Sequence, residues 1–217
     1  MKKKQSKKKT PNKKKKNYSE KTAFSSLETP KVATTPKRLG DLNLEYFTTV
    51  MWDETNAVKK DGTIRRETCF PENLGQLVLS GPHFYVGNPL YKTPRAICTE
   101  KAHYDCLDLT TLPSDYLPRT NYRPNVSHSD YYVRIPRVTW DKQKPVTDFY
   151  RLAARGMIGA AGERTYISSL IPKEVCHING IQTIAFKDPS ILLSAISFGS
   201  SLIADFFIKS IFFCYSF

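Results

Sequence analysis

The sequence predicts an α+β domain with short strands, two or three helices and long ordered loops, behind a disordered N-terminal arm. Short apolar runs rich in β-branched residues, several of them ended by proline or glycine, predict strands. Residues 107–140 contain proline repeatedly, which predicts a long loop region. Residues 1–40 are dominated by lysine and hold too few apolar side chains to form a core.

The basic character of the chain comes from this arm. Of the formal net charge of +13 over 217 residues, residues 1–40 carry +12, because their 13 Lys and one Arg face only Glu20 and Glu28. The rest of the chain is close to neutral, so overall charge says little about what the domain binds. Clustered lysines bind polyanions or direct proteins to the nucleus, and they also serve as solubilising extensions. The arm has no apolar core of the kind a secretory signal needs, so export is not expected.

The first half of the domain, which begins at residue 41, is predicted to be mostly irregular. A strand is expected within 41–52, where β-branched and aromatic residues are frequent. Residues 53–70 are polar and carry an Asp-Gly turn signal, which predicts a loop. Residues 74–80 suit either a short helix or a short strand. Residues 82–94 are too rich in glycine and proline for regular structure.

The second half is predicted to be more regular. Over 147–160 apolar residues recur at near-helical spacing, with Asp148 or the threonine before it as a cap and Gly159 as the end. This pattern predicts a helix. Two strands are expected after it, over 165–171 and 183–188, the first ended by a proline.

A mostly buried helix is predicted over 191–210. About 20 such apolar residues can span a bilayer, but Asp205 and Lys209 lie one turn apart on one face, where lipid would make both charges costly. We therefore expect a core helix at the end of the domain, which covers 41–210, and no membrane partner. Residues 211–217 continue without a cap or a polar stop and form an aberrant apolar terminus.

The five cysteines do not suggest a disulfide framework or a structural zinc site. Their number is odd and no two are spaced as Cys-x-x-Cys, which favours a reducing, cytoplasmic location. The pair Cys176-His177 invites a metal or nucleophile interpretation. The other histidines are scattered, however, and none has metal-ligand spacing. We interpret the pair as ordinary turn and core residues.

The tetrapeptide Asn88-Pro89-Leu90-Tyr91 is a second candidate for a catalytic site. Amino-group DNA methyltransferases hold a flipped base with Asn/Asp-Pro-Pro-aromatic, in which the Asn side chain bonds the target amine and the ring stacks on it. Here leucine replaces the second proline, and no glycine-rich cofactor loop precedes the motif. A small methyltransferase using this loop is therefore an alternative and not the preferred interpretation.

Arginine recurs beside aromatic and amide side chains through the predicted loops. Arginine pairs with guanine edges, asparagine with adenine, and hydroxyl groups with phosphates. Such contacts predict double-stranded DNA as a partner. The alternative is that the arginines pair with nearby acids, namely Glu67, Asp108, Asp115, Asp130 and Asp141. The candidate DNA-binding residues are Arg65, Arg66, Lys92, Arg95, Arg119, Asn121, Arg123, Arg134, Arg137, Arg164 and Thr165.

Residues 162–180, GERTYISSLIPKEVCHING, resemble a motif of the type II restriction–modification adenine-specific DNA methyltransferases. In that family Glu-Arg-Thr precedes a strand ending in Ile-Pro, and a His-Ile-Asn-like segment follows. Residues 80–95, 108–124 and 192–210 are similar, in the same order, to the segment after the catalytic domain, to a long loop region and to a helix packed on the recognition lobe. The matching motif residues are Glu163, Arg164, Thr165, Ile167, Ile171, Pro172, His177, Ile178 and Asn179.

The resemblance covers about residues 45–210 and implies a partial target-recognition domain that places one adenine for methylation. Methyl transfer from S-adenosylmethionine would belong to a methyltransferase domain absent from this chain, which is the second expected partner. The chain itself is then expected to hold no cofactor, no catalytic residue and no metal, and to be inactive alone. A membrane-associated basic protein remains a further alternative.

Overall fold

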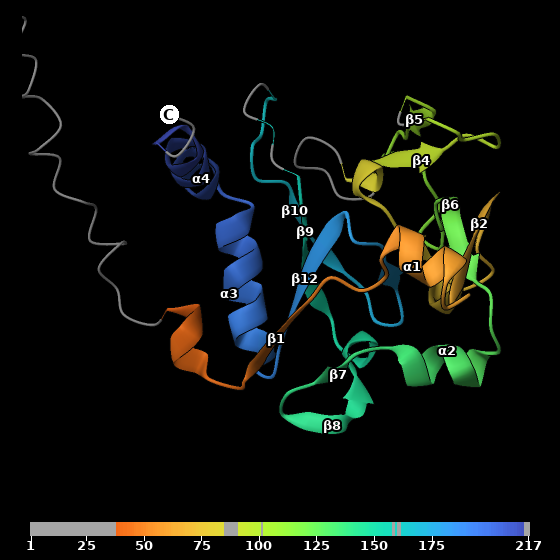
Figure 1. The fold of residues 1–217 in the computed structure, drawn as a ribbon. Coiled ribbons are helices and arrows are strands. Elements are labelled where there is room, and N and C mark those ends of the chain that lie inside the picture. The colour runs from red at the N-terminus through yellow and green to blue at the C-terminus, as the bar shows by residue number, and fades with distance from the viewer. Residues whose placement is uncertain (1–37, 85–90, 101, 158, 160–161, 215–217) are drawn as a thin grey trace, which may run out of the picture. The chain divides into compact units, whose positions relative to one another are not determined.

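Helices and strands are mixed through the domain, which confirms the α+β class (Figure 1). Contacts divide the chain into Met1–Arg38 and Leu39–Phe217, and every element below belongs to the second unit. The predicted disordered arm lies outside the described residues, except for its end, where the 3₁₀ helix η2 (Leu39–Leu42) begins. The computed structural model describes residues 38–84, 91–100, 102–157, 159 and 162–214.

The largest sheet has four antiparallel strands in the order β1-β12-β9-β10. Leu152 and Ile184 are register partners and share the face that packs on a helix. Ala153 and Ile181 lie on the opposite face, in a second apolar cluster. The strands are β1 (Tyr46–Thr49), β12 (Ile181–Phe186), β9 (Arg151–Arg155) and β10 (Ser168–Ile171).

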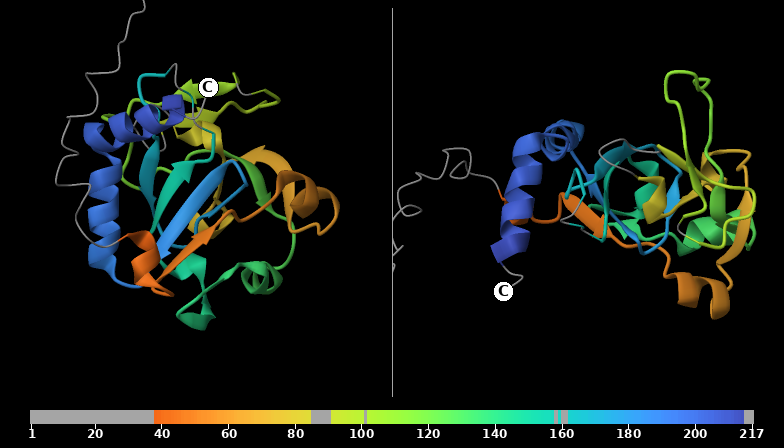
Figure 2. Two further views of the ribbon diagram at one scale, coloured as in Figure 1. Left: turned by 60° about the vertical axis from the view of Figure 1, so that its left-hand side comes forward. Right: turned by 90° about the horizontal axis from the view of Figure 1, so that it is seen from above.

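Helix α3 (Pro189–Gly199) covers one face of this sheet and contacts β9, β10 and β12 (Figure 2). It starts where the Asp188 carboxylate accepts the backbone N–H of Ser190, with proline at the first helical position. At its other end Gly199 lies so close to the sheet that a Cβ there would be 2.9 Å from Ser168 Oγ. Glycine therefore sets how closely the helix packs on the sheet.

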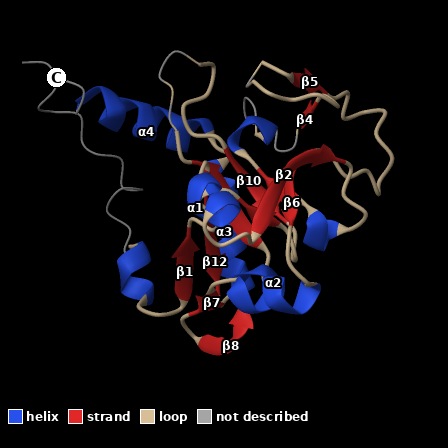
Figure 3. Ribbon diagram, turned by 45° about the vertical axis from the view of Figure 1, so that its right-hand side comes forward, coloured by secondary structure: helices blue, strands red, loops and turns tan. Residues whose placement is uncertain are grey.

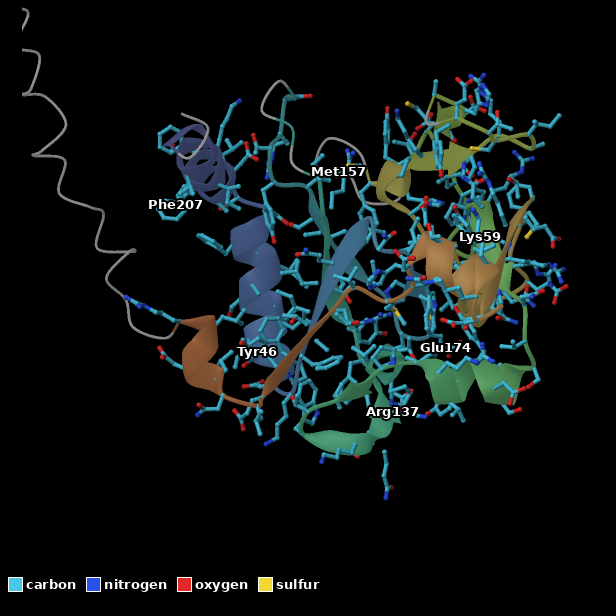
Figure 4. The ribbon with its side chains drawn as sticks, in the orientation of Figure 1. Tyr46, Lys59, Arg137, Met157, Glu174 and Phe207 are labelled. Carbon is cyan, nitrogen blue, oxygen red and sulfur yellow. The ribbon has the colours of Figure 1, made fainter. Side chains whose placement is uncertain are left out.

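The last helix differs from the prediction. Instead of one mostly buried helix over 191–210, α3 is followed by α4 (Leu202–Cys214), and α4 extends through residues 211–214 of the predicted aberrant terminus. The two axes are bent by 71°. Ile203, Phe206 and Phe207 of α4 are exposed, and Figure 4 labels Phe207 on this helix. Within the described part of the chain no single helix is long and apolar enough to cross a membrane, and α3 and α4 pass that test only as a bent pair.

The remaining strands form four two-stranded sheets on the other side of the domain. Three of these sheets contribute residues to a core in which Trp52, Tyr131 and Cys176 are buried together. The helices here are α1 (Glu54–Lys59) and α2 (His128–Arg134). The sheets pair β2 (Ile64–Cys69) with β6 (Thr120–Pro124), β3 (Val78–Leu79) with β11 (Cys176–His177), β4 (Lys92–Pro94) with β5 (Tyr104–Cys106), and β7 (Arg137–Val138) with β8 (Asp141–Pro145).

The predicted helix over 147–160 is wrong. A 3₁₀ turn, η5 (Val146–Asp148), leads directly into strand β9. Arg151 anchors this segment inside the domain. Its side chain is fully buried, and its guanidinium donates to the carbonyl oxygens of Pro172 and Val175. Burial lowers the pKa of Arg151 to about 10. Neighbouring side chains alternate between the two faces of the sheet, a period of two that a helix does not have.

The predicted loop over 53–70 is also wrong, because α1 and β2 occupy most of it. Asp53 caps α1 by accepting the backbone N–H groups of Thr55 and Asn56. Part of the irregular structure expected over 82–94 and 107–140 is regular, since β4, β6 and α2 lie there. The strands expected over 41–52, 165–171 and 183–188 are confirmed as β1, β10 and most of β12.

Candidate nucleic-acid interface

The β2–β6 and β4–β5 pairs adjoin each other and, with the residues next to them, carry seven of the candidate residues, six of which are cations (Figure 3). We call this region, residues 64–70, 92–106 and 119–124, the basic lobe. Its β2–β6 register places Arg65 opposite Arg123 and Arg66 opposite Tyr122. Arg65 and Arg66 are exposed and Arg123 is half-buried. Segments more than 50 residues apart in sequence thus present their cations together.

Glu67 offsets the repulsion between the two opposed arginines. Its Oε2 accepts Nε–H of Arg65 at 2.7 Å, and its Oε1 lies 3.3 Å from Nη1 of Arg123. The hydrogen bond from Arg65, followed by the one from Arg123, holds the pKa of Glu67 below its ordinary value against partial desolvation. Exposed ion pairs of this kind are weak, and each guanidinium has five donors. Both arginines therefore keep donors for an outside acceptor.

Arg66 ties the loop between β4 and β5 to β2. Its Nη2 donates to the carbonyl oxygens of Cys98 at 3.3 Å and Thr99 at 3.4 Å. At the base of that loop Nε of exposed Arg95 donates to Asp105 at 2.8 Å. Lys92 pairs in register with Cys106 on β5 and is half-buried.

Arg119 completes the basic lobe through a contact that the sequence does not reveal. Its guanidinium carbon lies 4.4 Å from the centre of the Phe70 ring, and Phe70 is 54% exposed. Its backbone N–H donates to Thr93 Oγ1 at 3.0 Å, which fastens the start of β6 to β4. A cation stacked on an exposed ring presents a flat surface of the sort on which bases stack. A single phenylalanine after a strand gives no sequence signal for this role.

A buried polar network supports the basic lobe from beneath. The hydroxyl of Tyr104 lies 3.0 Å from Ser80 Oγ and accepts Asn121 Nδ2–H at 2.7 Å. His83 Nδ1 accepts the backbone N–H of Ser80, and its Nε2 donates to the carbonyl oxygen of Arg119 at 2.9 Å. Burial lowers the pKa of His83 and raises the pKa of Tyr104 to about 12. Both groups are therefore neutral near pH 7 and fix the backbone that carries Arg119.

Asn121 and Thr165 do not lie where the sequence-based interpretation needs them. Asn121 is buried, and its Oδ1 accepts Thr68 Oγ1–H while its Nδ2 donates to Tyr104. Thr165 is also buried, and its backbone N–H donates to Asp205 at 2.8 Å. Both side chains are buried, and Thr165 Oγ1 has no hydrogen-bond partner among the described residues. Neither can present a polar group to DNA in this conformation, so both are removed from the candidate set.

The other three candidate arginines lie outside the residues that define the basic lobe. Arg134 donates to Thr63 Oγ1 at 2.6 Å, just before β2 begins, and so borders the basic lobe. Arg137 lies on β7 and stacks on Tyr132, on the opposite side of the domain from β4 and β5 (Figure 4). Arg164 donates to the carbonyl oxygens of Ser200 and Ser201 after α3. The hydrogen bonds of Arg137 and Arg164 thus go to residues outside the basic lobe.

The alternative interpretation was that the candidate arginines pair with five nearby acids. Only one of those five, Glu67, is seen to pair with a candidate arginine among the described residues. Glu67 pairs with two candidate arginines, as given above. Asp108 instead accepts from Thr110, which lowers the pKa of that carboxylate, and Asp130 accepts from Ser127. Asp141 pairs with Lys144. Within the basic lobe, Glu67 and Asp105 pair with three of its arginines, so these acids cancel part of its positive charge.

A cavity of about 220 Å³ opens beside Arg66, lined also by Glu54, Tyr104, Tyr122 and the 98–100 segment. A larger one of about 770 Å³ lies at the start of α3, between Lys173 and Phe186. The first is smaller than ordinary ligand pockets, and the second mixes both signs of charge. Neither reveals a reaction.

The other chemical hypotheses gain no support from the described residues. Residues 88–90 of the Asn-Pro-Leu-Tyr motif lie outside them. Cys176 and His177 are both fully buried on β11. Burial raises the pKa of Cys176, which disfavours the reactive thiolate, and lowers the pKa of His177 to about 3. Among the described residues no three His, Cys, Asp or Glu side chains gather as a metal site would require.

No protein-family model matches the sequence, and no similar chain is found among curated proteins or among solved structures.

Proposed function

We propose that the chain is a DNA-binding, target-recognition part of an adenine-specific DNA methyltransferase of a restriction–modification system, and that the basic lobe is its DNA contact. One observation carries this proposal: six cations lie on or next to strands β2, β4 and β6 of two adjoining strand pairs, namely Arg65, Arg66, Lys92, Arg95, Arg119 and Arg123. Arginine at such a surface pairs with phosphates and with guanine edges. The arrangement supports double-stranded DNA as the ligand.

The scaffold suits recognition better than catalysis. Arg66, Arg119 and Arg123 are each held by a hydrogen bond or stacking contact, so they lose little entropy on binding. The domain as a whole is close to neutral, and Glu67 offsets part of the charge of the basic lobe. Affinity would then come from few, well-placed contacts, which favours selectivity over general attraction to polyanions.

The remaining parts of the proposal rest on the resemblance of residues 162–180 and its companion segments. The parent enzyme uses S-adenosylmethionine in a methyltransferase domain outside this chain. That domain is the proposed second partner, and the proposed location is the cytoplasm.

The test is DNA binding measured by fluorescence anisotropy with a labelled duplex of about 25 base pairs. Because the lysine arm binds polyanions by itself, the measurement compares the full chain with a chain that begins at Leu39 and unfolds cooperatively. We expect the shorter chain to bind at low salt. Replacing Arg65, Arg95 and Arg119 together by alanine is expected to weaken its binding at least about tenfold.

Arg137→Ala with Arg164→Ala is the matched control, since both arginines lie off the basic lobe. These changes are expected to alter affinity less than about twofold. A Leu39 chain that folds but ignores DNA at low ionic strength refutes the proposal. So does a control that weakens binding as much as the triple change.

A further inference from the structure

We propose that Ile97, in the loop between β4 and β5, is an apolar wedge that enters a base step and unwinds the duplex held by the basic lobe. The inference rests on the proposed function and assigns to one residue a role beyond charge contact. Ile97 is 79% exposed, the largest exposed fraction among the described large apolar side chains.

A single exposed isoleucine is common on protein surfaces and needs no explanation by itself. What distinguishes Ile97 is the loop that presents it. The next residue, Cys98, is buried, and its Sγ lies 3.3 Å from Asn121 Nδ2. The carbonyl oxygens of Cys98 and Thr99 accept from Arg66. With Cys98 anchored inward, the side chain before it is turned outward.

The base of the hairpin is closed as well. The backbone N–H of Arg95 donates to the carbonyl oxygen of His103 at 3.0 Å, and His103 N–H donates to Glu100 O at 3.0 Å. Nε of Arg95 also donates to Asp105. Hydrogen bonds therefore fix the loop at both ends and at its centre. This keeps the Ile97 side chain exposed to solvent instead of packed against the domain.

Three arginines contact this loop or its base. Arg66 bonds to its centre, and Arg95 pairs with Asp105 at its base. Arg119 reaches the last carbonyl oxygen of β4. Glu100 in the same loop offsets part of this charge. Proteins that deform DNA commonly combine this pattern: an apolar Ile, Leu, Met or Phe between cations, which pushes between two bases while the cations hold the flanking phosphates. Unstacking costs a few kcal/mol per step, and the added phosphate contacts offset that cost.

The experiment measures unwinding of a closed circular plasmid relaxed by topoisomerase I with the full chain bound. Insertion at base steps unwinds the duplex and so changes the linking number of the relaxed product. Any contribution from bending or wrapping stays in the Ile97→Ala chain, so the difference between the two chains measures insertion. We expect a clear shift in topoisomers with the natural chain. Ile97→Ala is expected to reduce the shift per bound chain by about threefold or more, and Ile97→Leu to keep it.

Ile97→Lys separates insertion from attraction, because it adds a cation and removes the wedge. It is expected to bind a labelled duplex at least as tightly as the natural chain and to lose the topoisomer shift. Leu193→Ala, at a similarly exposed apolar position on α3, is the control and is expected to change neither result.

Two results overturn the inference in distinguishable ways. DNA binding with no topoisomer shift, or a shift that survives Ile97→Ala and Ile97→Lys, overturns the wedge and leaves the DNA-binding proposal standing. Absence of DNA binding in the Leu39 chain overturns both.

Discussion

The carboxylate of Asp205 on α4 accepts the backbone N–H of Thr165, at 2.8 Å, in the segment that leads into β10. The same oxygen accepts the N–H of Tyr166 at 2.7 Å and lies 3.7 Å from Arg164 Nε. A buried carboxylate on a helix thus satisfies two loop donors, in the way that capping side chains satisfy helix donors. Asp205, which the sequence suggested would lie beside Lys209, is a structural anchor for α4.

Asp205→Ala is expected to lower the free energy of unfolding by about 3 kcal/mol, because two buried N–H groups lose their acceptor. Asp205→Asn keeps an acceptor oxygen and is expected to lose roughly half as much. Urea unfolding followed by circular dichroism measures both. Lys209→Ala, one turn later on the same helix, is the control, and an equal loss there contradicts the assigned role of Asp205.

Gly199→Ala tests the close approach of α3 to the sheet. The added Cβ would lie 2.9 Å from Ser168 Oγ and 3.1 Å from Tyr166 Cε1, too close for either atom to stay in place. Crowding outweighs the helix preference of alanine, and we expect a net loss of about 1 kcal/mol in thermal or urea unfolding.

Ser168→Ala in the same chain removes the closest of these atoms and is expected to recover most of the loss. If the double variant is no more stable than Gly199→Ala alone, crowding against Ser168 is not the cause. The single Ser168→Ala variant completes the cycle.

Stability is expected to fall as pH drops below about 6.5, the pKa of an unfolded histidine. Burial, with a smaller contribution from nearby Arg151, lowers the pKa of His177 to about 3 in the folded chain. The unfolded state therefore binds a proton first as pH falls from 6.5 towards 3, and folding loses about 2 kcal/mol from this residue by pH 5. The pKa of buried His83 is lowered too and adds to the trend in the same direction.

Urea unfolding at pH 7 and pH 5 measures this loss. His177→Gln is expected to flatten the dependence, whereas a change at the exposed His128 is expected to leave it intact. A pH dependence that is the same in the His177→Gln chain contradicts the assignment.

Arg65→Ala and Arg66→Ala are neighbours on β2 with different expected effects. Either change is expected to reduce the slope of log K against log salt for DNA binding by about 0.9, the value for one phosphate contact. Only Arg66→Ala is expected to speed amide hydrogen exchange at residues 97–100, since of these two arginines only Arg66 bonds to that loop. Equal exchange in both variants contradicts the tethering role of Arg66.

Sequence reasoning found the strands whose side chains alternate and failed where tertiary packing outweighs local preference. The segment around Arg151 is rich in good helix formers, and its apolar spacing fits a helix. It is a strand because Leu152 is needed against α3 and Ala153 against the opposite core, while Val175 and Pro172 supply acceptors for a buried guanidinium. None of these partners is near in sequence.

The sequence predicted which residue types form the candidate site, but not which individual residues belong to it. Arg65 and Arg123 stand out in the sequence, but only the β2–β6 register shows that they face each other across Glu67. Asn121 looked like a base-reading amide and is instead buried against Tyr104. Phe70 and Ile97 become candidate contact residues only because the fold places cations beside them.

The edge strand β1 joins the sheet solely through β12. Glu45 and Lys187, which flank this pairing and form an ion pair at 3.0 Å, are 142 residues apart in sequence. During synthesis β1 leaves the ribosome early and waits, with its edge unpaired, until β12 emerges. Pairing between such distant segments slows folding to roughly milliseconds or seconds, and until β12 pairs with it the edge of β1 is open to association with other chains.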